Sequence, residues 1–299
     1  MQILSETVEN PPSRSVFGNY GVAGSDFESA VNTPNANGQV ILVEQPLQRQ
    51  IDGAMARCFV YRWLAAGFEY PSDETWDWFI APETQCALQN CLANVQADPA
   101  DPLWRSAVKL ITQLRVDRLD EFVDHYLYAF GHAARGPCPI NEIEYGDLKA
   151  DPLFQPHRLA DLSAFYRAFG LDLADDGAER QDHLSIELEF MSVLAGKEAF
   201  ALEHQLDEEA SLCHNGQRKF LREHLGRWLP ACVWRLSKSE GILAALALFA
   251  GAFVAADCSQ FGITPGSEDL LLRPVDEAGE SLCASCGITN LPPGALTTT

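Results

Sequence analysis

The sequence is short of positive charge. Its 299 residues contain 21 lysines and arginines against 42 aspartates and glutamates, which gives a formal net charge of -21 and an isoelectric point near 4.6. Because such a surface repels a phosphate backbone, we expect no nucleic-acid partner. Two readings of the charge stay open: it attracts a basic partner, such as a peptide rich in arginine or lysine, or it only keeps the protein soluble.

Long apolar segments are missing as well. The most apolar uncharged run, Gly241 to Ala256, falls short of the roughly 20 residues that span a bilayer and indicates a buried core helix instead. The first residues have no apolar core of signal-peptide type, and Arg14 stands alone where a twin-arginine signal has a pair. Nine cysteines, an odd number, do not resemble the disulfide framework of a secreted domain. We therefore expect a cytoplasmic protein with reduced thiols and no membrane span.

Known catalytic patterns are also missing. The sequence contains no phosphate-binding glycine loop, no nucleophile elbow and no H-E-x-x-H zinc motif. Sustained two-residue alternation, which would indicate strands, does not occur either. The sequence therefore gives no reason to expect an enzyme.

Helical periodicity is what the sequence does contain, and it predicts an all-α protein with a single helical-bundle domain. We place that domain at residues 47–257. Residues 1–46 are rich in Pro, Gly, Asn and Ser and predict a flexible N-terminal arm. Residues 258–299 predict an irregular, cysteine-containing C-terminal tail.

Helix boundaries follow from individual residues. Ser72 is placed to cap a helix just after a Tyr-Pro break, and Gly170 to end another. From residue 182 to about residue 229 we expect one long helical region, broken once near Asn215-Gly216. Pro230 should stop that region, because proline lacks the amide hydrogen that a helix interior needs.

Two segments stand out. The first, residues 126–146, reads YLYAFGHAARGPCPINEIEYG, and the second, residues 179–191, reads ERQDHLSIELEFM. They resemble the two signature regions of the TorD/DmsD/NarJ family, in which a helix ending in Tyr-x-x-x-Phe leads into a proline-containing loop that ends in Glu-x-x-Tyr. A later helix of that family begins with Asp-His-Leu and continues Glu-Leu-Glu-Phe-Met. We call the two segments the first and second signature segments.

The first signature segment contains Cys-Pro-x-x-Glu-x-Glu-Tyr-Gly, which is similar to chaperones of the subgroup serving ethylbenzene, dimethylsulfide or selenate oxidoreductases. It departs from the family pattern at Ile140-Asn141, where Pro-aromatic is usual. The resemblance implies an all-α chaperone that binds the twin-arginine leader and the apo form of a molybdenum oxidoreductase catalytic subunit. It also implies that the chaperone assists insertion of the bis-molybdopterin guanine dinucleotide cofactor before export.

The signature residues also have simpler interpretations. Asp182 can cap a helix, and His183 and Glu187 lie four residues apart, where they would form an ion pair on an exposed helix face. Spacing alone favours this cap and ion pair, whereas the resemblance favours a leader-binding role for Asp182 and His183. Aromatic residues of the first segment would line an apolar groove for the leader, or pack in the core. The predicted client-binding set is Tyr126, Phe130, Pro137, Pro139, Glu142, Tyr145, Asp182, His183 and Glu187.

Cys283 and Cys286 form a C-x-x-C pair in the tail, which is half of a zinc-type site. Cys258 and Cys138 are candidates for the other two ligands, and a histidine could replace one of them. A thioredoxin-like redox role is disfavoured, because no βαβ pattern surrounds the pair. The alternatives are a zinc or iron–sulfur accessory protein, or two free thiols in a tail.

Overall fold

A computed structural model describes residues 46–273, apart from residues 96–97, 99, 116–117, 132–134, 147–153 and 174–178. Within these residues the fold is helical and contains no strand, only isolated bridges, so the predicted all-α class is confirmed. The predicted arm, residues 1–46, lies outside the described residues except for its last position. The elements are α1 (Pro46–Phe68), α2 (Asp73–Ile80), α3 (Pro82–Val95), α4 (Pro102–Ile111), α5 (Leu119–Phe130), the 3-10 turn η2 (Glu142–Glu144), α6 (Phe154–Ala168), α7 (Leu184–Glu203), α8 (Asp207–Glu223), α9 (Leu225–Leu236) and α10 (Ile242–Gln260).

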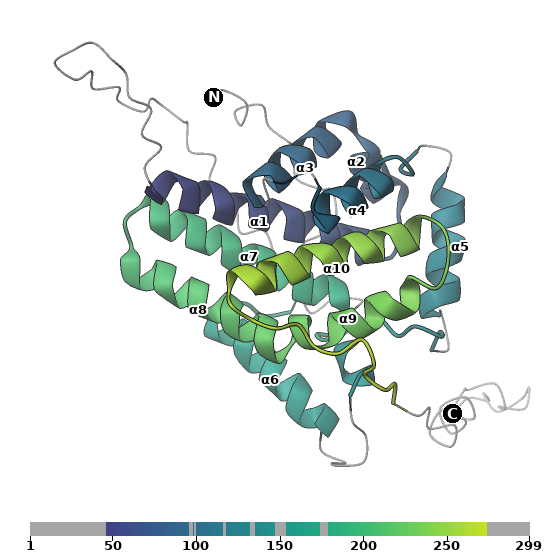
Figure 1. The fold of residues 1–299 in the computed structure, drawn as a ribbon. Coiled ribbons are helices and arrows are strands. Elements are labelled where there is room, and N and C mark those ends of the chain that lie inside the picture. The colour runs from purple at the N-terminus through teal and green to yellow at the C-terminus, as the bar shows by residue number, and fades with distance from the viewer. Residues whose placement is uncertain are drawn as a thin grey trace, which may run out of the picture.

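The core forms around two helices, α1 and α10. Helix α1 packs along α7, where Cys58 Sγ lies 3.6 Å from Ser192 Oγ, and α10 packs across α4 and α9 (Figure 1). Trp63 of α1 makes an edge-on ring contact with Phe249 of α10, with ring centroids 5.7 Å apart. Helix α10 is the one described helix long and apolar enough to cross a membrane, but most of it is buried in the bundle. It is therefore the core helix that its composition predicts.

Several helix ends obey the predicted local rules. The Ser72 hydroxyl accepts a hydrogen bond of 3.2 Å from the Thr75 amide and so caps α2. Asp101 caps α4 in the same way, with Pro102 as the first helical residue. Gly170 ends α6 with a φ of +74°, a conformation that favours glycine.

The predicted break at Asn215-Gly216 is wrong. Helix α8 runs through both residues, and the chain turns earlier, at Gln205, which has a φ of +57°. Gly216 is a packing residue, because an added Cβ would lie 2.4 Å from the ring of Phe169. A second turn follows at His224, between α8 and α9.

Pro230 does not stop the helix as predicted; it lies inside α9. A proline in a helix leaves the carbonyl four residues earlier without its usual donor. Here that carbonyl belongs to Gly226, and it accepts a 2.9 Å hydrogen bond from the Gly266 amide. An added Cβ on Gly266 would lie 2.0 Å from the Arg227 carbonyl oxygen, so glycine is needed for this approach. The segment after α10 therefore docks on α9 at the position that proline frees.

The end of the helical body also differs from the prediction. Helix α10 continues past residue 257 to Gln260, so Cys258 lies in a helix and not in an irregular tail. The following residues stay on the body: the Arg273 amide donates to the Glu144 carbonyl at 2.9 Å, and Tyr145 forms a bridge with Leu272. Residues 271–273 therefore lie along the end of the first signature segment.

Candidate functional site

The two signature segments are joined by backbone hydrogen bonds. The Glu142 amide donates to the Asp182 carbonyl at 2.9 Å, and the Leu184 amide donates to the Ile140 carbonyl at 3.0 Å. An isolated bridge links Asn141 and His183. We call this region, residues 138–145 and 179–187, the signature junction.

Asp182 ties the junction together with its side chain. The carboxylate accepts from the Ile143 amide at 3.2 Å and from Arg180 Nε at 2.6 Å. The prediction that it caps α7 is wrong, because the cap is His183, whose Nδ1 accepts from the Ser185 amide at 3.3 Å. Asp182 lies one residue before that cap and turns toward the loop.

His183 and Glu187 do not form the predicted exposed pair. Both are buried. Burial, aided by the charge of Arg180, lowers the pKa of His183 to about 3, so its ring is neutral. Burial raises the pKa of Glu187, and nearby Glu142 raises it further. Glu187 Oε2 accepts from Trp228 Nε1 at 3.0 Å, and its Oε1 has no hydrogen-bond partner among the described residues.

Glu142 is buried too, but one histidine and two arginines surround its carboxylate. Its carboxylate lies 2.9 Å from His224 Nδ1 and 3.0 Å from Arg227 Nη2, and it also pairs with Arg158 of α6. Burial alone raises the pKa of Glu142, but these three partners outweigh burial and lower that pKa to about 2. The arginines that Glu142 binds are therefore those of its own chain.

The first signature segment buries its aromatic residues. Tyr126 and Phe130 of α5 are buried, with ring centroids 4.7 Å apart, and the Tyr126 hydroxyl donates to the Phe68 carbonyl at 3.1 Å. Tyr145 is fully buried, donates to the Pro139 carbonyl at 2.6 Å and packs on Trp228. These rings pack in the core and do not line an open groove.

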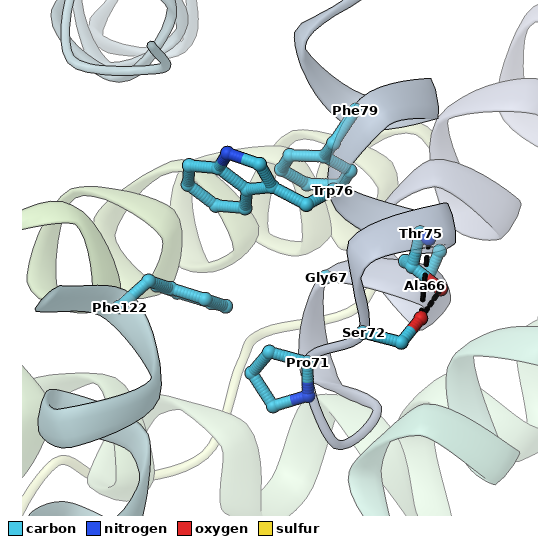
Figure 2. A pocket seen from close by; sticks show the side chains of 8 residues that line it. All are labelled: Ala66, Gly67, Pro71, Ser72, Thr75, Trp76, Phe79 and Phe122. Carbon is cyan, nitrogen blue, oxygen red and sulfur yellow. Dashed lines mark hydrogen bonds between the residues drawn. The ribbon is translucent and has the colours of Figure 1, made fainter. Parts of the chain in front are cut away.

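The loop prolines differ in exposure: Pro137 is exposed and Pro139 is buried. A small apolar depression does occur among the described residues, but beside the junction of α1 and α2 (Figure 2). It is lined by Pro71, Trp76 and Phe122, among others. None of the predicted client-binding residues lines it.

An exposed edge of the site combines aromatic and acidic groups. Tyr70, at the end of α1, is 52% exposed, and its ring contacts that of Tyr126 with centroids 5.8 Å apart. Burial raises the pKa of the Tyr126 hydroxyl, and the charges of Glu179 and Glu69 raise it further. Glu179 also reaches His183 Nε2, at 3.5 Å. We call Glu69, Tyr70, Tyr126 and Glu179 the acidic–aromatic edge.

Comparisons with known proteins fit this picture. The profile of the nitrate reductase delta subunit family matches residues 96–233. A perchlorate reductase assembly chaperone from Dechloromonas aromatica is 31% identical over 193 residues, which cover 63% of this chain and 81% of the relative. This chain belongs to the TorD/NarJ family. A TorD chaperone from a Psychrobacter species is 28% identical over 58% of this chain and 76% of its own length. A selenate reductase assembly chaperone from Thauera selenatis is 35% identical over 35% of this chain and 53% of its own length.

The TorD/NarJ family match includes both signature segments, since residues 126–146 and 179–191 lie inside it. The structure adds residues that spacing did not indicate. His224, in the turn between α8 and α9, and Arg227 of α9 complete the surroundings of Glu142, and Tyr70 supplies the exposed ring. The only sequence signal for Tyr70 was the Tyr-Pro pair that ends α1.

The predicted zinc ligands are not assembled within the described residues, and no group of three metal-ligating side chains occurs there. Cys138 lies beside Cys232, with sulfur atoms 3.9 Å apart. Cys258 is buried in α10. Cys283 and Cys286 lie outside the described residues, so zinc at this pair stays a prediction.

Proposed function

We propose that this protein is a cytoplasmic assembly chaperone for the catalytic subunit of a molybdenum oxidoreductase. It binds the unfinished subunit and its twin-arginine leader, holds the subunit until the bis-molybdopterin guanine dinucleotide cofactor is inserted, and catalyses no reaction itself. The support is the family membership together with the names of three relatives, the assembly chaperones of perchlorate, chlorate and selenate reductases. The relatives act on oxidoreductases, and a client of the same class is proposed here.

The acidic–aromatic edge is the proposed site for the leader arginines. A guanidinium group stacks on an aromatic face and pairs with a carboxylate, and Tyr70 and Glu179 offer both at the surface. The single observation that carries this placement is the half-exposed Tyr70 ring, which contacts the ring of Tyr126, a residue whose pKa the charges of Glu179 and Glu69 raise. The net charge of -21 adds long-range attraction for a basic leader.

Other predicted residues have a positioning role in this proposal. Asp182 is buried and accepts hydrogen bonds from Arg180 and from the Ile143 amide of the loop. In this proposal it therefore positions the acidic–aromatic edge without contacting the leader. His183 is neutral and buried, and it contacts Glu179 from beneath. Replacing Asp182 or His183 would therefore weaken leader binding through displacement of Glu179.

Calorimetric titration of the full chain with a synthetic twin-arginine leader tests the proposal. The leader orders on binding, so its affinity alone should be modest. Glu179→Gln should weaken binding about tenfold, which corresponds to the loss of one ion pair of about 1.4 kcal/mol. The matched control is Glu208→Gln, which removes the same charge from the exposed start of α8.

Two results would count against the proposal in different ways. If wild-type protein binds no such leader and no precursor subunit, the chaperone function fails. If the leader binds but Glu179→Gln and Glu208→Gln have equal effects, the function stands and the acidic–aromatic edge is not the site. A leader with both arginines replaced by lysine should bind more weakly to wild type, since lysine lacks the planar group that stacks on Tyr70.

A further inference from the structure

Two cysteines far apart in the sequence meet where the signature junction contacts α9. Cys138 belongs to the first signature segment and Cys232 to α9, 94 positions later, and their sulfur atoms lie 3.9 Å apart. Both side chains are buried and both are free thiols. A disulfide needs a sulfur–sulfur distance of about 2.05 Å, so the two atoms must approach by about 2 Å.

The surroundings of the pair favour reaction at Cys138. Its sulfur lies 3.6 Å from the Tyr145 hydroxyl and 3.7 Å from the Cys232 carbonyl oxygen. The hydrogen bond with Cys232, the Tyr145 hydroxyl and the charge of Arg235 together hold the pKa of the Cys138 thiol below its usual value, against the opposing effect of burial. The pKa of Cys232 is raised by its hydrogen bond to Cys138 and by burial. We take Cys138, whose sulfur lies beside the Tyr145 hydroxyl, as the nucleophile and Cys232 as the resolving thiol.

We propose that Cys138 and Cys232 form a reversible, oxidant-sensitive disulfide, and that hydroperoxides are the oxidants. The Cys138 thiolate attacks one oxygen of hydrogen peroxide, the O–O bond breaks, and hydroxide leaves to give a sulfenic acid. The Cys232 sulfur then attacks the Cys138 sulfur, the S–O bond breaks, and the Cys232 proton leaves with the hydroxide as water. In total two thiols lose two electrons to one peroxide, which becomes two molecules of water.

The disulfide would fix the first signature segment against α9 and so stabilise the signature junction. Cys138 lies between Pro137 and Pro139, and its amide donates to the Ala129 carbonyl of α5 at 2.9 Å. A covalent link to Cys232 therefore joins the end of α5 and the loop to α9. Because the link closes a long loop of the unfolded chain, it should raise the midpoint of thermal unfolding by roughly 5 °C or more.

Peptide mapping of the full chain tests this inference. Reduced protein is exposed to a small excess of hydrogen peroxide, alkylated with N-ethylmaleimide under denaturing conditions, digested and analysed by mass spectrometry. The expected result is a cross-linked peptide that joins positions 138 and 232, and that dithiothreitol removes. Cys232→Ser should abolish the cross-link and leave Cys138 oxidised to the sulfenic acid. The matched control is Cys213→Ser, which removes a buried thiol of α8 and should leave the cross-link unchanged.

Wild-type protein alone can refute the inference, whatever the stability of the variants. Full alkylation of both Cys138 and Cys232 after peroxide treatment would overturn it. A cross-link from Cys138 to any other cysteine, including those of the tail, would overturn it as well. An unchanged or lowered midpoint of thermal unfolding in the cross-linked protein would overturn the proposed stabilisation of the signature junction.

Discussion

Two glutamates at the signature junction are equally buried, yet we expect different changes in stability when each is replaced by glutamine. Glu142 is ionised, because His224, Arg158 and Arg227 surround its carboxylate. For Glu187 we expect the protonated form, because burial and the charge of Glu142 raise its pKa and outweigh the Trp228 hydrogen bond and the charge of Arg158. Glutamine has nearly the shape of glutamic acid but never carries its charge.

The size of the effect at Glu142 follows from its pKa. A carboxyl with a pKa of 4.5 in the unfolded chain and about 2 in the folded protein contributes about 3 kcal/mol to stability at neutral pH. Because the folded pKa is the lower one, this contribution is complete above about pH 5 and is lost as the pH falls toward 2. Glu142→Gln should therefore lower the free energy of unfolding by about 3 kcal/mol at pH 7.

For Glu187 the sign is reversed. Its pKa is raised in the folded protein, so ionisation costs stability once the pH exceeds the usual glutamate value. Glu187→Gln should therefore change stability by less than about 1 kcal/mol at pH 7, or increase it. Urea unfolding followed by circular dichroism measures both variants. Between pH 5 and pH 3, the difference between wild type and Glu142→Gln should narrow. Equal losses in the two variants at pH 7 would refute the assigned charge states.

Three further substitutions test the packing. Gly266→Ala should lower the free energy of unfolding by about 2 kcal/mol, because its Cβ would collide with the Arg227 carbonyl and detach the segment after α10. Gly53→Ala in α1 is the matched control: nothing lies within 4 Å of its Cβ position, so alanine should stabilise the helix by about 0.5–1 kcal/mol. Asp182→Asn should cost about 2 kcal/mol by weakening the charged hydrogen bonds to Arg180 and the loop. Urea unfolding measures all three, and a neutral Gly266→Ala or Asp182→Asn would contradict the contacts described.

Local rules predicted the helices well wherever one residue decides the boundary. Ser72 and Gly170 act within their own turns, so their positions were readable from the sequence. Gly216 and Pro230 were misread because their effect depends on a distant partner. The ring of Phe169 makes glycine necessary in the middle of α8, and the Gly266 amide satisfies the carbonyl that Pro230 leaves free.

The candidate site was predictable in its residues but not in its arrangement. Motif spacing brought attention to Asp182, His183 and Glu142, and these residues do meet. Spacing along one helix cannot tell which other element covers it, so His183 and Glu187 were expected at the surface. Glu187 is covered by Trp228 of α9, 41 positions later in the sequence, and His183 by the loop residue Asn141, with which it forms a bridge.

The decisive measurement is the identification of what this protein carries in its own cells. Affinity-tagged full-length chain, purified from cells that are assembling their reductase, should hold a molybdenum oxidoreductase catalytic subunit. Mass spectrometry should find that subunit with its twin-arginine leader still attached and with less than the full complement of cofactor. Recovery of the protein alone, or only with mature, leader-free subunit, would contradict the proposed function.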